Sequence, residues 1–150
     1  IATLCNNGVR LKPHLLKNVV DPMTGEITDI PQPEVLDTIN FKEENLKTVL
    51  DGMRRGAKEQ GGTAYATFGA VAYTVGTKTG SAQATAGSHA VFVAFAPFDD
   101  PEIAIACVVE NGGQGSRIAS LAKDVLDAYF SPDTGAASTS QGGPENKPIM

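Results

Sequence analysis

The residues best suited to chemistry form one short segment, Lys78-Thr79-Gly80-Ser81-Ala82-Gln83. Because side chains alternate along a strand, Thr79 and Ser81 are expected on the same side, with two hydroxyls in a row. Hydroxyls beside the amides of a strand edge can receive a carboxylate or a peptide that lies alongside. Lys78 is expected on the other side as a positive charge, and Gly80 lets a ligand backbone come close. The segment predicts a binding edge for the anionic end of a peptide.

A second candidate is Ser120-Leu121-Ala122-Lys123, where a spacing of three would place a hydroxyl and an amine on one helix face. A lysine-activated serine is geometrically possible there, and it would make the chain a hydrolase in its own right. Motifs this short arise often by chance. We therefore interpret Ser120 and Lys123 as ordinary residues of a packing helix.

The remaining candidates have simpler interpretations. Residues 111–115 could bind an anion through their amides, but no Lys-Ser/Thr phosphate signature follows, so a strand-to-helix turn is the simpler interpretation. His14 and His89 lie far apart without metal-ligand spacing, and His89 is expected at the entrance of a strand. Cys5 and Cys107 make no disulfide framework, and we expect structural roles for both.

The elements that must position the central segment are mostly strands. Residues 71–75 are expected to lead into it as a strand. The apolar runs 90–96 and 103–109 have strand length and are typical of central strands covered on both faces. Earlier in the chain, residues 11–20 and 26–30 flank a turn with Pro and Gly in favoured places, which predicts a hairpin.

Two helices are predicted from apolar stripes. The first has a capping box, Asn40 followed by Glu43, and is expected to end at Gly56. Residues 1–8 are expected to be the last turns of a helix ended by Gly8, and residues 57–69 a loop or a broken short helix. Strands followed by a packing helix predict an α+β fold, an antiparallel sheet with helices against it. The two stripes consist of Leu46, Val49, Leu50 and Met53, and of Ile118, Leu121, Ala122, Val125, Leu126 and Tyr129.

The composition fits one globular domain, with 41% hydrophobic and 19% charged residues among 150. A net charge of −5 argues against a nucleic-acid partner, which normally demands a basic face. From residue 131 the chain is rich in Ser, Gly, Pro and Thr. We therefore expect a domain over residues 1–130 and a disordered tail over residues 131–150. Because the chain begins with Ile1, we interpret it as a part of a longer chain.

A collinear set of short motifs runs through almost the whole predicted domain: Asn6-Asn7-Gly8-Val9-Arg10 with Pro13-His14-Leu15, Val20-Asp21-Pro22-Met23-Thr24-Gly25-Glu26, Gly52-Met53, Gly62-Thr63-Ala64, the segment 78–83, His89-Ala90-Val91-Phe92-Val93-Ala94-Phe95-Ala96-Pro97 and Val109-Glu110-Asn111-Gly112-Gly113. In these motifs and in their order, the chain resembles the class B penicillin-binding proteins, namely the penicillin-binding protein 2 family. Such a set is far more specific than one motif.

The resemblance implies part of a penicillin-binding/β-lactamase-like transpeptidase fold and the activity of a peptidoglycan D,D-transpeptidase. Such enzymes cross-link cell-wall stem peptides through an acyl-serine intermediate and are acylated by β-lactams, with no cofactor. The resemblance assigns Lys78 to the hydrogen-bond network of the serine and the Ser81 amide to the oxyanion hole. It assigns the Thr79 and Ser81 hydroxyls to the substrate carboxylate, with Gly80 and Gln83 on the same substrate-binding strand. The family more often has Thr where this chain has Ser81, and the hydroxyl is kept.

In the family, Ser-x-x-Lys and Ser-x-Asn precede Lys-Thr-Gly, and neither lies upstream of Lys78 here. We therefore expect a C-terminal part of a transpeptidase domain, inactive alone because it lacks the nucleophile. Its expected partners are stem peptides, β-lactams and the missing N-terminal half of the domain, and exposed apolar surface is expected to favour self-association. The whole protein is expected to be anchored in the cell membrane and to act on the extracytoplasmic, periplasmic face. The alternative is a non-catalytic transpeptidase-like module that binds peptides or proteins.

Overall fold

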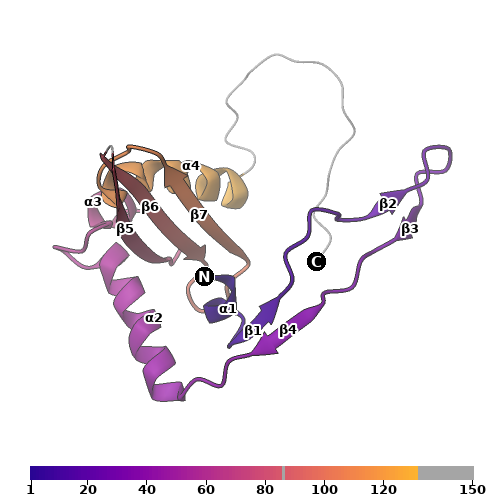
Figure 1. Ribbon diagram of the computed structural model, residues 1–150, viewed down its shortest axis with the longest axis horizontal. Helices are drawn as coiled ribbons and strands as arrows, with labels where there is room; N and C mark the ends of the chain where they lie inside the picture. Colours follow the sequence, from indigo (N-terminus) through magenta and orange to yellow (C-terminus); the bar gives the residue numbers. More distant parts are fainter. Residues whose placement is uncertain (86, 132–150) are drawn as a thin grey trace, which may run out of the picture.

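The computed structural model describes residues 1–85 and 87–131. The body is a three-stranded antiparallel sheet in the order β5-β6-β7, formed by Gly76–Ala84, Gly87–Ala96 and Ile103–Val109 (Figure 1). Helix α4 (Ala119–Phe130) follows the short 3-10 helix η1 (Gly115–Ile118) and packs on one face of this sheet. Helix α2 (Glu43–Lys58) lies beside β5, and the short helix α3 (Tyr65–Phe68) connects the two. The predicted α+β class is confirmed.

The face of the sheet under α4, called the packed face, contains the core. The Phe92 ring of β6 stacks on that of Phe68 from α3, with 5.9 Å between ring centroids, and both are fully buried with Leu126 of α4. Complete burial of such a side chain stabilises the fold by about 1.5–3 kcal/mol. Of the stripe predicted for the last helix, Ile118, Ala122 and Leu126 are buried in this core. The prediction is wrong for Leu121, Val125 and Tyr129, which are exposed.

The opposite face, called the open face, carries the alternate residues of the same strands. On β7 these are Ala104, Ala106 and Val108, all exposed, and Val108 is 65% exposed. Within the described residues β7 pairs only with β6, so the prediction that β7 is central and covered on both faces is wrong. Its continuous apolar run arises because alanines and a valine occupy outward positions. The predicted exposure of apolar surface is confirmed.

A hairpin arm precedes the body and extends away from it (Figure 1). After α1 (Ala2–Cys5), strand β1 (Val9–Leu11) pairs with β4 (Val35–Thr38), and β2 (Val19–Val20) pairs with β3 (Ile27–Asp29). The predicted hairpin is confirmed, and its turn is held by Asp21, whose Oδ1 accepts the Met23 and Thr24 amides at 2.7 and 3.1 Å. Residues 12–18 form no strand, which fits the missing N–H of Pro13.

Three predicted boundaries are wrong. Helix α2 begins at Glu43 after Lys42, without a side-chain cap, so Asn40 makes no capping box; Glu43 and Glu44 instead place negative charge in the first turn. The helix also ends at Lys58, two residues beyond Gly56. Residues 71–75 form no strand, and two hydrogen bonds hold them: Lys58 Nζ donates to Val71 O at 2.8 Å, and the Phe98 amide donates to Thr74 Oγ1 at 2.9 Å.

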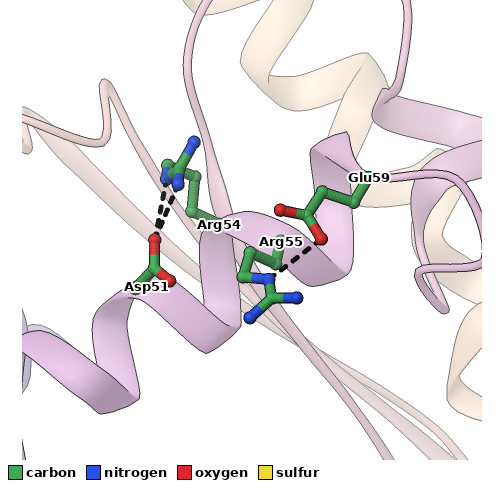
Figure 2. A network of polar contacts seen from close by, with 4 residues as sticks. All are labelled: Asp51, Arg54, Arg55 and Glu59. Carbon is green, nitrogen blue, oxygen red and sulfur yellow. Dashed lines mark hydrogen bonds and ion pairs between the residues drawn. The ribbon is translucent and has the colours of Figure 1, made fainter.

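The outer surface of α2 carries two exposed ion pairs. Figure 2 shows that Arg54 pairs with Asp51 and Arg55 with Glu59, at 2.7 and 2.9 Å. Pairs this exposed contribute little to stability. The predicted tail from residue 131 onward lies outside the described residues, apart from Ser131. No helix in the described ranges has the length and apolar character required to cross a bilayer.

Candidate functional site

Strand β5 brings the predicted site residues together along one edge of the sheet. Thr79 pairs with Phe92 and Ser81 with Ala90, so both hydroxyls lie on the packed side of the strand, as predicted from alternation. Lys78 pairs with Val93 and therefore lies on the open side. Among the described residues β5 pairs only with β6, which leaves its other backbone edge available to an extended peptide.

The Thr79 hydroxyl has a partner that the sequence did not identify. It lies 3.4 Å from the hydroxyl of Thr63, in the loop between α2 and α3. This loop folds closely over the end of α2, where the Ala64 amide donates to Gly56 O at 3.0 Å and a Cβ on Gly62 would lie 2.4 Å from the same oxygen. The Gly61-Gly62 pair was the available signal, because only glycine tolerates such a close approach.

Lys78 lines a cavity of about 670 Å³ on the open face. Its ammonium donates to the neighbouring Thr79 carbonyl at 2.6 Å and makes no ion pair with any described residue. The rest of the cavity wall is mainly apolar, with Val49 and Met53 of α2 and Val93 of β6. A positive charge without a counterion beside apolar walls is suited to an anionic group.

Two glycines allow close contacts in the middle of β5. A Cβ on Gly80 would lie 3.3 Å from Val91 Cβ, so a side chain there would crowd β6. A Cβ on Gly115, the first residue of η1, would lie 2.2 Å from Val91 O and 2.5 Å from Gly80 O. The backbone of η1 therefore rests directly on the strand at Gly80. Gln83, the last predicted substrate-binding residue, is exposed opposite Ser88 near the end of the hairpin.

The turn at residues 111–115 uses its amides internally. The Asn111 amide donates to His89 Nδ1 at 3.0 Å, the Gly112 amide to Val109 O at 3.1 Å and the Gly113 amide to Ser88 O at 2.9 Å. Three of the five amides in this segment are therefore engaged within the fold, and the segment connects β7 to η1 as the predicted strand-to-helix turn.

The serine alternative in the last helix is not supported by the contacts of its lysine. Lys123 binds the carboxylate of Asp127 rather than Ser120, and the Tyr73 hydroxyl donates to the same carboxylate at 2.8 Å. The hydrogen bond from Lys123 is the main cause that lowers the pKa of Asp127, while burial acts in the opposite direction. Burial first, and then the bond to Asp127, raises the pKa of Tyr73. An amine engaged by a carboxylate is a poor base for a serine.

The histidines and cysteines lie apart from one another. His14 Nδ1 is 2.8 Å from Leu16 O on the arm, while His89 binds the turn. Cys5 and Cys107 are both free thiols, and burial raises the pKa of each. Within the described ranges, no group of three or more His, Cys, Asp or Glu side chains could hold a metal ion.

Comparison with known proteins gives a consistent result over nearly the whole described chain. Residues 1–127 match the model of the penicillin binding protein transpeptidase domain. The chain is 33% identical to penicillin-binding protein 2A of Bacillus subtilis over 150 residues, covering 87% of this chain and 21% of that protein. It is 28% identical to the peptidoglycan D,D-transpeptidase MrdA of Escherichia coli K12, covering 83% of this chain and 22% of that protein. The chain thus spans about a fifth of the length of these relatives.

A solved structure has the same fold. The crystal structure of Pseudomonas aeruginosa PBP2 in complex with WCK 5153 superposes with a TM-score of 0.74 at 35% sequence identity. The match covers 89% of this chain and 29% of that chain.

Proposed function

Because this chain belongs to the penicillin-binding protein transpeptidase family and is similar to penicillin-binding protein 2 members, we propose that it forms the substrate-binding part of a peptidoglycan D,D-transpeptidase. The relatives named D,D-transpeptidases supply the reaction class. The whole protein means here this chain joined to a serine-bearing half of the domain. In it the serine attacks the last peptide carbonyl of one stem peptide, breaks that amide bond, releases the C-terminal residue and forms an acyl-enzyme. An amine of a second stem peptide then attacks the ester, forms the new amide bond and releases the serine. A β-lactam takes the place of the first peptide.

Each predicted site residue of β5 has a role that suits its position. Thr79 and Ser81 hold the terminal carboxylate of the donor peptide or the β-lactam through their hydroxyls. Lys78, on the other side of the strand, stabilises the serine network with its charge. The Ser81 amide donates to the oxyanion that develops during acyl transfer. Gly80 and the exposed Gln83 accommodate the ligand backbone along the edge.

The observation that carries this proposal is the arrangement of β5 itself. Among the described residues it is an edge strand with hydroxyls on one side, supported by Thr63, and a lysine without an acidic partner on the other. A row of hydroxyls, half-buried at Thr79 and exposed at Ser81, beside a backbone edge that pairs with no described strand is adapted to an extended anionic peptide.

Labelling of the whole protein with a fluorescent penicillin tests the proposal. Thr79→Val and Ser81→Ala should each lower the second-order labelling rate by about tenfold, which corresponds to the loss of one charge-assisted hydrogen bond. The matched controls are Thr28→Val on the arm and Ser120→Ala on α4, and both should label at the wild-type rate. Equal labelling in all four variants would contradict the role of β5. A whole protein that takes no label would indicate the non-catalytic binding module instead.

The further partners and the location of the whole protein belong to the same proposal. Residues 1–130 form the C-terminal part of the domain, and the open face is where the serine-bearing half packs. The whole protein is anchored at the extracytoplasmic side of the cell membrane. Without that half the exposed apolar surface drives self-association, so Val108→Lys should shift this chain toward monomer in sedimentation velocity. A wild-type chain that is already monomeric would contradict this part.

A further inference from the structure

We propose that His89 is a positioning residue for the substrate-binding strand β5. Its Nδ1 holds the turn that leads into η1, and η1 rests on β5 at Gly80. This inference rests on the proposed function of β5. His89 belongs to β6 and pairs with Ala82, two residues beyond Gly80 on the neighbouring strand. It is therefore part of the same hairpin as the hydroxyl row, although it contributes no hydroxyl, charge or amide to the edge.

The contact that carries the inference is a hydrogen bond from the backbone to the imidazole. The Asn111 amide donates to His89 Nδ1 at 3.0 Å, across the junction of β6 with the end of β7. Asn111 has a φ of +54°, in the left-handed region, which asparagine adopts more readily than most other non-glycine residues. A Cβ on Gly87 would lie 3.1 Å from Asn111 Oδ1, so the side chain of Asn111 also packs closely against the start of β6.

The turn connects Asn111 to the substrate-binding strand β5. Gly113, with a φ of +76°, donates its amide to Ser88 O at 2.9 Å, and two residues later Gly115 rests on the backbone of Gly80 and Val91. His89, the turn and Gly115 thus form a closed connection from β6 back to the middle of β5. Among the hydrogen bonds of the described residues, release of Asn111 would leave that of the Gly113 amide to Ser88 O to hold the turn against β6.

The direction of this hydrogen bond identifies the ring nitrogen that matters. A ring nitrogen that accepts a hydrogen bond carries no proton, so Nδ1 is the accepting nitrogen of His89 and Nε2 carries the ring proton. A replacement side chain preserves the contact only if it places an acceptor at the position of Nδ1.

Three substitutions of His89 distinguish the loss of the hydrogen-bond acceptor at Nδ1 from the loss of the ring's volume. In His89→Asn the side-chain oxygen takes the position of Nδ1, whereas in His89→Gln it reaches the position of Nε2, and His89→Leu has no acceptor. In penicillin labelling of the whole protein, we expect His89→Leu and His89→Gln to lose about tenfold in the acylation step and His89→Asn to stay near wild type.

Hydrogen exchange gives a readout that is independent of catalysis. The Asn111 amide should exchange faster in His89→Leu and His89→Gln than in the wild type or His89→Asn. Wild-type labelling in His89→Leu, with Thr79→Val still impaired, would overturn the inference and leave the proposed function intact. If the wild type takes no label, the proposed function fails, and unchanged Asn111 exchange across all variants would overturn the anchorage itself.

Discussion

The two faces of the β5-β6-β7 sheet differ most sharply at β7, since on β6 the open side also carries Phe95, which is fully buried. On the packed face Phe92 and Ala94 are fully buried under α4, whereas on the open face Val108 is 65% exposed. The apolar runs of β6 and β7 do not distinguish the two faces. The apolar character of a strand thus indicates that its side chains can be buried. It does not indicate which element covers each face. Strand β5 joins both faces, with hydroxyls on the packed side and Lys78 on the open side.

The largest effect is expected on the packed face. Phe92→Ala removes a fully buried ring that stacks on Phe68, and should lower the free energy of unfolding by about 3–5 kcal/mol. The matched truncation on the open face, Val108→Ala, should cost less than about 1 kcal/mol because that side chain is mostly in solvent. Urea unfolding followed by circular dichroism measures both. Equal losses would mean that the open face is covered in solution.

The next largest effect is expected where η1 packs against β5 on the packed face. Gly115→Ala places a methyl group 2.2 Å from Val91 O, so η1 must move away from the strand. Such overpacking should destabilise the chain by about 1–3 kcal/mol and slow penicillin labelling of the whole protein. Gly52→Ala is the control, since a Cβ there meets nothing within 4 Å inside helix α2. That control should stabilise the chain by about 0.5–1 kcal/mol, and a loss comparable to that of Gly115→Ala would refute the argument from close approach.

A smaller effect is expected where α4 meets the loop before β5. Tyr73→Phe removes a hydrogen bond to the Asp127 carboxylate and should cost about 1 kcal/mol at neutral pH. The pKa of Asp127 is lowered in the folded chain, so the ionised carboxylate contributes stability above its unfolded pKa and loses it as pH falls through the folded one. The difference between wild type and Tyr73→Phe should therefore shrink in acid. A difference independent of pH would assign the loss to packing of the ring.

The smallest effect is expected on the outer surface of α2, away from both faces. Glu59→Gln breaks the exposed pair with Arg55 seen in Figure 2, and the melting temperature should not change measurably. A clear drop would show that this surface is covered by another part of the whole protein or by a second copy.

Much of this arrangement follows from the sequence, for identifiable reasons. The alternation of Thr79 and Ser81 against Lys78 depends only on strand geometry and was predicted correctly. The stripe of the last helix was correct in part, because Ile118, Ala122 and Leu126 are buried whereas Leu121, Val125 and Tyr129 are exposed. Thr63 was missed because its approach to Thr79 depends on how a glycine loop folds over α2. Strand β4 was missed since it is fully exposed and is defined by pairing with β1, which no local pattern reports.

The central claim is most directly tested by the intact mass of two samples after incubation with a β-lactam, this chain alone and the whole protein. We predict no adduct on the chain alone, and on the whole protein one adduct per molecule on a serine outside these 150 residues. Proteolytic mapping identifies the residue. An adduct on Ser120, or on any residue of the isolated chain, would contradict the assignment of this chain as the substrate-binding part of the domain.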